Sequence, residues 1–281
     1  MSETLYTHFA LEVRTPAYWR VTFEHPPINT VTATTVEELA NLVDKIETDP
    51  DLKVVLFDSA NPDFYLAHYD TEGNAAKTVS MRPGPTGMHP WLDLTARLSR
   101  APVASIAAIR GRARGAGSEF ILACDLRFAS RENTVVGQPE VGLGLIPGGG
   151  PMARLSRLIG RGRALEVLLL GDDFDGPLAE QYGYVNRLFP DARLDDEVDA
   201  IARRLASFER YAIAGIKRYV DDATLPPDSD LPPALADFVE TAGRPETIAR
   251  LTKLVSLGLN SDDDLERRLG QRVTEAAPNH A

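Results

Sequence analysis

The order of apolar and polar residues predicts two strands and a helix at the start of the chain. Residues 9–13 and 18–23 alternate between apolar and polar side chains, which predicts a β-hairpin with one buried face. Apolar residues then recur every three or four positions over residues 32–48, the spacing of a helix buried along one side. The wholly apolar residues 54–57 follow and predict a buried strand.

Predicted strands and helices continue to alternate as far as residue 190. Further helices are expected at residues 91–98, 116–123, 152–158 and 163–170, and further strands at 103–109, 126–129, 134–136 and 185–189. This alternation is typical of an α/β core with helices packed on a sheet. Beyond it the spacing is helical, in segments at 194–207, 210–222, 231–242, 245–257 and 262–274. We therefore expect an α/β core at residues 1–190 and a helical C-terminal region at 191–281.

The composition and net charge of the chain make some classes of binding partner unexpected. The chain has 281 residues, of which 43% are hydrophobic and 25% charged, as in an ordinary folded protein. Its net charge of −11 repels phosphate groups, so nucleic acid and anionic membrane surfaces are not expected as partners. Cys124 is the single cysteine, which excludes an intrachain disulfide, and the histidines lack the paired spacing of a metal site. A bound metal ion is therefore not expected.

The chain lacks the sequence features of a secreted or membrane-spanning protein. Residues 1–14 contain no basic region followed by a long apolar run, so a signal peptide is not predicted. The longest apolar stretches, at 103–109 and 164–170, are far shorter than the roughly 20 residues of a membrane span. Together with the single cysteine, these features predict a cytoplasmic protein.

Two glycine-rich segments stand between predicted strands and helices. Residues 110–119 lead into a helix, where glycines allow close approach of a ligand and free N–H groups can bind an oxyanion. These glycines have neither dinucleotide-binding nor P-loop spacing. Residues 137–150 hold Glu140 beside apolar neighbours. The competing interpretations are a tight turn with solvated arginines and a solvent-facing glutamate.

A third segment, residues 63–70, combines aromatic side chains with His68 and Asp70 after the strand predicted at 54–57. A packed strand end with a surface histidine is the competing interpretation here. The G-x-S-x-G pattern of a serine nucleophile is absent from the chain. Taken singly, none of the three segments identifies a reaction.

Taken in order, these segments resemble the crotonase superfamily, which includes the enoyl-CoA hydratases and isomerases. The resemblance extends from about Tyr18 to Tyr219, and the order and spacing of its motifs make it specific. The matching residues are 27–31, 66–70, Gly111, 115–119, 123–125, 139–140, Gly144, 147–148 and 183–186.

The resemblance implies a fold, an assembly and a ligand. The implied fold is an α/β spiral of repeated ββα units, with the CoA and acyl site in residues 1–190. The helices of residues 191–281 are then expected to mediate a homotrimer or a dimer of trimers. The implied ligand is an acyl-CoA thioester, a small-molecule substrate that carries coenzyme A itself, so no separate cofactor is expected.

The resemblance also implies roles for individual residues. Glu119 and Glu140 match the acid/base pair of the family's hydratases, and the backbone N–H groups of Tyr69 and Ala116 match its oxyanion hole. Two carboxylates beside one water suit the hydration of a 2-enoyl-CoA to a 3-hydroxyacyl-CoA. The residues expected to contact the substrate are Leu66, Ala67, His68, Asp70, Gly115 and Lys217.

Three residues depart from the family pattern and leave the reaction open. His68 stands where the family normally has glycine, and Arg114 where it usually has a small or apolar residue. Tyr69 is bulky for a position beside the thioester. Double-bond isomerisation, thioester hydrolysis and hydratase-lyase chemistry therefore remain alternatives. So does a non-catalytic CoA-binding subunit, for which His68 is the reason.

Overall fold

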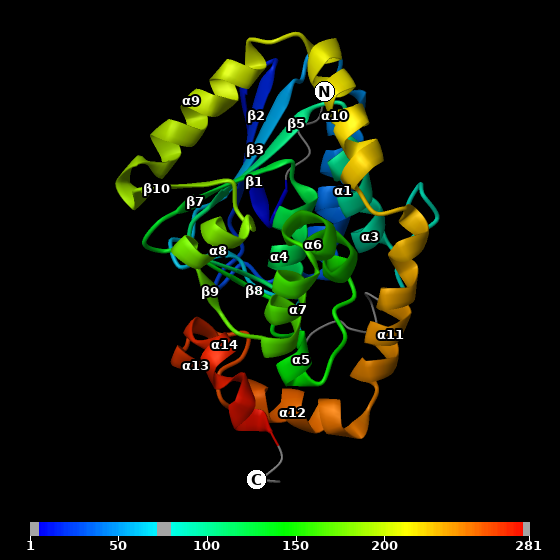
Figure 1. The fold of residues 1–281 in the computed structure, drawn as a ribbon, viewed down its shortest axis with the longest axis vertical. Helices are drawn as coiled ribbons and strands as arrows, with labels where there is room; N and C mark the ends of the chain where they lie inside the picture. Colours follow the sequence, from blue (N-terminus) through cyan, green and yellow to red (C-terminus); the bar gives the residue numbers. More distant parts are fainter. Residues whose placement is uncertain (1–5, 72–79, 278–281) are drawn as a thin grey trace.

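The described residues form two β-sheets, and the larger of them has six strands. The computed structural model describes residues 6–71 and 80–277. The strands of the larger sheet, in spatial order, are β1 (Phe9–Thr15), β2 (Tyr18–Phe23), β3 (Val54–Ser59), β5 (Ala104–Ile109), β7 (Leu126–Ser130) and β10 (Arg187–Phe189). β1 and β2 form the predicted antiparallel hairpin, and the other neighbouring pairs of this sheet are parallel (Figure 1).

A second sheet is built from short strands. They are β4 (Phe64–Leu66), β6 (Arg112–Arg114), β8 (Val135–Gly137) and β9 (Phe174–Asp175). β3, β5 and β7 are each followed by one of these short strands and then by a helix. The chain therefore turns through repeated strand–strand–helix units, which is the predicted α/β spiral. The sequence pattern predicts neither β4 nor β6, because β4 is a short apolar run without alternation and β6 lies in the glycine-rich residues 110–119, which indicate a turn.

Helices cover both faces of the larger sheet. The helices that precede β10 are α1 (Ala33–Thr48), α3 (Pro90–Arg100), α4 (Ala116–Ala123), α5 (Glu140–Leu143), α6 (Pro151–Ile159), α7 (Arg161–Leu170) and α8 (Gly176–Tyr182). Val55 and Phe57 of β3 pack with α1, α3 and α4, whereas Val54 and Leu56 pack with α9 (Leu194–Ala206). β3 is therefore apolar on both faces, as the sequence predicts.

α4 is buried along its whole length. Its residue Phe120 makes edge-to-face contacts with Phe23 and Phe57. Gly115 caps the helix at its N-terminal end, and its φ of 48° favours glycine and turns the chain sharply out of β6. The turn and the ring contacts together fix where the first residues of α4 lie.

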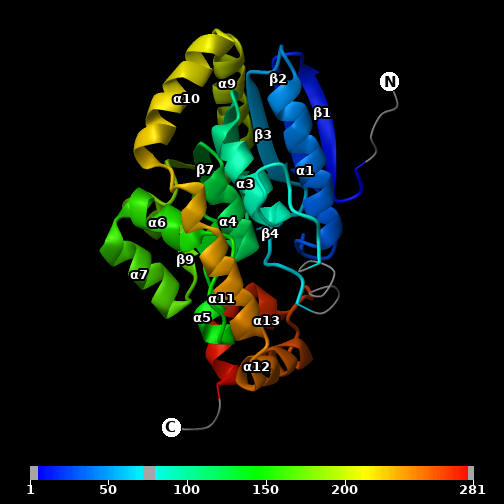
Figure 2. The same ribbon diagram turned by 90° about the vertical axis from the view of Figure 1, so that its right-hand side faces the viewer.

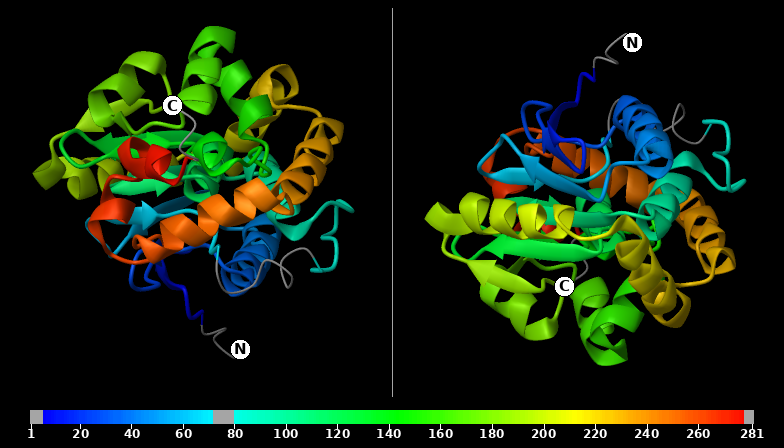
Figure 3. Two further views of the ribbon diagram at one scale, coloured as in Figure 1. Left: turned by 90° about the horizontal axis from the view of Figure 1, so that it is seen from below. Right: turned by 90° about the horizontal axis from the view of Figure 1, so that it is seen from above.

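The residues after β10 form helices that pack back on the core. They are α9, α10 (Arg210–Thr224), α11 (Pro232–Ala242), α12 (Pro245–Ser256), α13 (Asp264–Arg267) and α14 (Leu269–Arg272), with short 3-10 helices between and after them. α9 and α10 lie at one end of the molecule and α12 to α14 at the other (Figure 1, Figure 2). Seen from below in Figure 3, the orange and red C-terminal helices cross that end of the molecule. Within residues 6–71 and 80–277, every helix is too short or too polar to cross a membrane.

The helix predicted over residues 262–274 is broken into α13, α14 and a 3-10 helix, with the break at Arg268. The carbonyl of Glu266 accepts a hydrogen bond from Arg114 at 2.6 Å, and that of Arg267 accepts one from Arg112 at 2.7 Å. In a continuous helix these carbonyls would accept from the following turn. Two distant arginines therefore replace helical hydrogen bonds, an effect that the local pattern does not predict.

Candidate active site

Glu119 is held by two neutral donors. It lies in the first turn of α4, and its side chain is buried. Trp91 Nε1 of α3 donates to Glu119 Oε2 at 2.8 Å, and the backbone N–H of Gly149 donates to Oε1 at 2.7 Å. A Cβ at Gly149 would lie 1.9 Å from Oε2, so only glycine fits there. Burial raises the pKa of Glu119, while the two donors act in the opposite direction by stabilising the carboxylate.

Glu140 is the first residue of α5 and lies against the glycine turn that precedes α4. Its side chain is buried, so the interpretation of Glu140 as a solvent-facing residue is wrong. A Cβ at Gly115 would lie only 2.8 Å from Glu140 Oε1. Burial, followed by the negative charge of Glu119, raises the pKa of Glu140 to about 8. The fold therefore brings two carboxylates from separate segments together and gives them different surroundings.

A buried chain of polar side chains supports Glu140 from β8 and α4. Gln138 is completely buried and immediately follows β8. In the amide orientation that satisfies both neighbours, its nitrogen donates to the Glu140 carboxylate at 3.0 and 3.3 Å. Its oxygen then accepts from Ser118 Oγ at 2.8 Å, and the Ser118 and Tyr184 hydroxyls hydrogen-bond to each other. Glu140 is therefore oriented by a fixed donor.

Tyr69 and Ala116 lie on two segments that are hydrogen-bonded to each other. The carbonyl of Ala67 accepts from the N–H of Gly117 at 3.1 Å, which links the loop after β4 to the start of α4. The same loop pairs with Val31 through a short parallel bridge at Tyr69. Ala116 is the first residue of α4, so its N–H has no acceptor within the helix. The roles of Tyr69 and Ala116 in an oxyanion hole stay predictions.

Most of the predicted substrate contacts lie near these two segments. Leu66 and Ala67 are buried at the end of β4, and Asp70 is partly exposed. Gly115 faces His68, whose Cβ is 3.3 Å from the place that a Cβ on the glycine would take. The fold therefore groups these five residues, and their contact with substrate stays a prediction.

His68 and Arg114, which depart from the family pattern, are both buried. His68 Nε2 hydrogen-bonds Glu266 Oε2 at 3.0 Å. Burial opposes a charge on the ring, but the Glu266 carboxylate outweighs it, so the pKa of His68 is raised. Arg114 binds both carboxylate oxygens of Asp173, at 2.6 and 2.7 Å. The interpretations of His68 as a surface residue and of Arg114 as a solvated one are therefore wrong.

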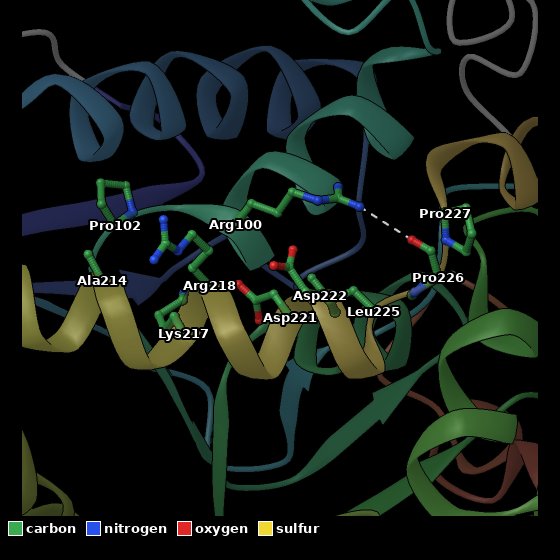
Figure 4. Close-up of a pocket in the computed structure, with 10 residues that line it drawn as sticks. All are labelled: Arg100, Pro102, Ala214, Lys217, Arg218, Asp221, Asp222, Leu225, Pro226 and Pro227. Atoms are coloured by element: carbon green, nitrogen blue, oxygen red, sulfur yellow. Dashed lines mark hydrogen bonds between the residues drawn. The ribbon is translucent and has the colours of Figure 1, made fainter.

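Lys217 lies at the opposite end of α4 from the glutamates. Its Nζ donates to Asp125 Oδ2 at 2.6 Å and to the Val103 carbonyl at 2.9 Å. Lys217 also lines a cavity of about 360 Å³ beside α10 (Figure 4). The other charged residues of its wall are Arg100, Arg218, Asp221 and Asp222. The ammonium is thus paired with a carboxylate, and its contact with CoA stays a prediction.

Several side chains and backbone groups of the site are missed by the sequence patterns. From the sequence, Trp91 is recognised only as an apolar residue of the helix predicted at 91–98. Gln138 and Gly149 lie inside the glycine-rich segment that holds Glu140, and this proximity is the signal that points to them. Glu266 has no local signal, since 198 positions separate it from His68. The described residues bring together no group of three or more His, Cys, Asp or Glu side chains able to hold a metal ion.

Two curated relatives match most of this chain. A probable enoyl-CoA hydratase of Mycobacterium leprae is 31% identical over 202 residues, which cover 72% of this chain and 76% of the relative. A short-chain-enoyl-CoA hydratase of Clostridium acetobutylicum is 32% identical over 204 residues, with the same two coverages of 72% and 76%. Both matches are long enough to include the two glutamate segments.

A family model and a solved structure extend the match. A crystal structure from Streptomyces avermitilis, provisionally named an enoyl-CoA hydratase, is similar at a TM-score of 0.90 and 39% identity. The similarity covers 95% of this chain and 96% of that one. Residues 17–230 match the family model described as enoyl-CoA hydratase/isomerase. The chain therefore belongs to the enoyl-CoA hydratase/isomerase family, as its motifs predict.

Proposed function

We propose that the protein hydrates a 2-enoyl-CoA thioester to a 3-hydroxyacyl-CoA. The observation that carries the proposal is the proximity of two buried glutamates in different surroundings. Glu119 receives N–H donors from two groups, Trp91 and Gly149, whereas Glu140 receives them from the Gln138 amide and lies beside the negative charge of Glu119. Relatives named enoyl-CoA hydratase support the same reaction.

Burial raises the pKa of both glutamates, and the remaining surroundings place the proton on Glu140 in preference to Glu119. The donors to Glu119 stabilise its carboxylate, and the raised pKa of Glu140, about 8, keeps that group protonated at neutral pH. Glu119 then accepts a proton from water as the water oxygen bonds to the β-carbon, and Glu140 gives its proton to the α-carbon. Proton transfer from Glu119 back to Glu140 restores the pair. Water is thereby added across the double bond, and both glutamates return to their starting states.

The thioester oxygen gains negative charge while the α-carbon awaits its proton. In this proposal the N–H groups of Tyr69 and Ala116 bind that oxygen. One such donor contributes roughly 3–4 kcal/mol to transition-state stabilisation in comparable sites. Gln138, by donating to Glu140, fixes the direction from which the α-carbon receives its proton.

The absorbance of the conjugated enoyl thioester tests the proposed reaction. Crotonyl-CoA and longer or aromatic enoyl-CoAs are mixed with the protein, and the absorbance of at least one must fall as its double bond is hydrated. Release of free CoA thiol would indicate hydrolysis, and a rising absorbance from a 3-enoyl-CoA would indicate isomerisation. An unchanged absorbance with every chain length contradicts the hydratase proposal.

The proposed substrate brings coenzyme A with it, so the reaction has no separate cofactor. The proposed assembly is a homotrimer or a dimer of trimers. Exposed apolar side chains on α10 support an interface between copies, namely Tyr211, Ile216, Tyr219 and Val220. Sedimentation velocity measures the assembly, and a monomer at micromolar concentration contradicts it. A cytoplasmic location stays a prediction.

A further inference from the structure

A cluster of charged side chains, all buried except the partly buried Asp173, adjoins the two segments that carry Tyr69 and Ala116. The members of this cluster, which we name the charge clamp, are His68, Arg114, Asp173 and Glu266. His68 directly precedes Tyr69, and Arg114 lies two residues before Ala116. The charge clamp therefore includes one residue within two positions of each proposed oxyanion donor.

The imidazole of His68 is fixed at both of its nitrogens. Nε2 donates to Glu266 Oε2 at 3.0 Å, and Nδ1 donates to the carbonyl oxygen of Tyr69 at 2.8 Å. Both partners are oxygen acceptors, so the ring satisfies them only as an imidazolium with two N–H groups. The second hydrogen bond also fixes the peptide plane that follows Tyr69.

Arg114 joins the second segment to the same glutamate. Its Nη1 donates to the main-chain carbonyl of Glu266 at 2.6 Å and lies 3.8 Å from Oε1 of that residue. Nε and Nη2 donate to the two oxygens of Asp173 at 2.6 and 2.7 Å. Arg114, which is 1% exposed, is thus held between the Glu266 carbonyl and the Asp173 carboxylate.

A gain in folding stability does not by itself explain why these charged side chains lie in the interior. Removing an ion from water costs several kcal/mol, and well-packed apolar residues often stabilise a core as much as a buried ion pair. His68 and Arg114 are both departures from the family pattern, and both contact Glu266. His68 binds the carboxylate of Glu266 and Arg114 binds its main-chain carbonyl, so one residue of α13 joins the two segments that carry the proposed donors.

We propose that Glu266 is a positioning residue for the oxyanion hole, which fixes the separation of the Tyr69 and Ala116 N–H groups by binding His68 and Arg114. The inference rests on the proposed function, because it concerns how a thioester oxygen is held. It gives α13, in the helical C-terminal region, a part in the site of its own chain.

Turnover of Glu266→Gln provides the first test. Displaced donors weaken transition-state binding more than ground-state binding, so kcat falls roughly 10- to 100-fold while KM for the enoyl-CoA changes about twofold or less. Glu275→Gln is the matched control, since this exposed glutamate on the same region pairs with Arg272. An unchanged kcat in Glu266→Gln overturns the inference.

The 13C resonance of a bound thioester carbonyl provides a second test, which does not depend on turnover. [1-13C]Butyryl-CoA has no double bond to hydrate, and its carbonyl resonance moves downfield when N–H donors polarise it. We expect a downfield shift on binding to the wild-type protein and a smaller one on binding to Glu266→Gln. Equal shifts overturn the positioning role. If the shifts differ but no enoyl-CoA is hydrated, the hydratase proposal fails and the positioning role stands.

A double-mutant cycle tests whether Glu266 acts through His68. His68→Gln keeps a donor on the side chain but removes the charge. If the two residues act as one unit, the double variant loses less kcat than the product of the two single losses. Independent, multiplicative losses contradict the inference. If Glu266→Gln does not fold, 15N spectra of the wild-type imidazole decide, since a neutral His68 ring at pH 7 contradicts the arrangement of donors.

Discussion

The two ends of α4 hold charged side chains in different ways. At its N-terminal end, Glu119 and Glu140 lie near each other, and Glu119 receives hydrogen bonds from the neutral groups of Trp91 and Gly149. Beyond its C-terminal end, Asp125 binds the ammonium of Lys217 at 2.6 Å. The first arrangement leaves a proton that the carboxylates can exchange, whereas the second neutralises one charge with its opposite.

This difference separates a site suited to proton transfer from a structural ion pair. Two neighbouring buried carboxylates raise each other's proton affinity, which is what an acid catalyst at neutral pH requires. A carboxylate held by an ammonium has no such proton to give. Changes at the N-terminal end of α4 should therefore reduce the rate of hydration, and changes at the C-terminal end should reduce stability.

The largest effect is expected from the glutamates themselves. Glu119→Gln and Glu140→Gln each remove one proton-transfer group, so kcat should fall by roughly 10²- to 10⁴-fold while butyryl-CoA still binds. Glu246→Gln, the same change at an exposed position of α12, should leave kcat unchanged. Either active-site variant that retains more than about one tenth of the wild-type rate contradicts the acid/base pair.

A methyl group on Gly149 should have the next largest effect. Its Cβ would lie 1.9 Å from Glu119 Oε2, so the carboxylate must move and kcat should fall roughly 100-fold. Gly162→Ala in α7 is the matched control, because a Cβ there meets no atom within 4 Å. Equal activity of the two variants would show that the position of Glu119 is unimportant.

Trp91→Phe should have a smaller effect on the rate. The aromatic ring is kept, but the Nε1 donor to Glu119 is lost, which removes a hydrogen bond to a charged group. We expect kcat to fall by about 10-fold, which corresponds to roughly 1.4 kcal/mol. Steady-state kinetics with the best enoyl-CoA substrate measure this change, and a wild-type kcat argues against the donor's importance.

At the other end of α4, the effect should be on stability. Lys217→Met leaves Asp125 without its ammonium partner, and the free energy of unfolding should fall by roughly 1–3 kcal/mol. Lys253→Met, at an exposed position of α12, should change it by less than about 0.5 kcal/mol. Urea unfolding measures both. A rise in KM for acyl-CoA in Lys217→Met would support the predicted CoA contact in addition.

Much of the fold is predictable from local patterns, whereas Glu119 and Glu140 are singled out by the resemblance that their segments show when taken in order. The hairpin of β1 and β2 alternates in polarity, and Glu119 and Glu140 each lie in a glycine-rich segment beside a strand and a helix. β4 and β6 have only three residues each, and their pairing depends on the spiral as a whole.

The charge clamp is not predictable from local patterns, because it joins distant residues. His68 and Glu266 are 198 positions apart, and Arg114 and Asp173 are 59 apart. In the sequence, His68 and Arg114 are visible only as unexpected residues at two positions of a family motif. Because both side chains are buried, each charge requires a partner of opposite charge. The fold supplies Glu266 of α13 to His68 and supplies Asp173, which lies before β9, to Arg114.

The pH dependence of kcat/KM tests the proton arrangement most directly, because this parameter reports on the groups of the free enzyme. Glu140 must carry its proton to act as the acid, and its pKa is raised to about 8 by burial and by Glu119. The proposal therefore predicts that kcat/KM for enoyl-CoA hydration falls as the pH rises through about 8. A value that stays constant between about pH 6.5 and about pH 9.5 would contradict the arrangement in which Glu140 holds the proton.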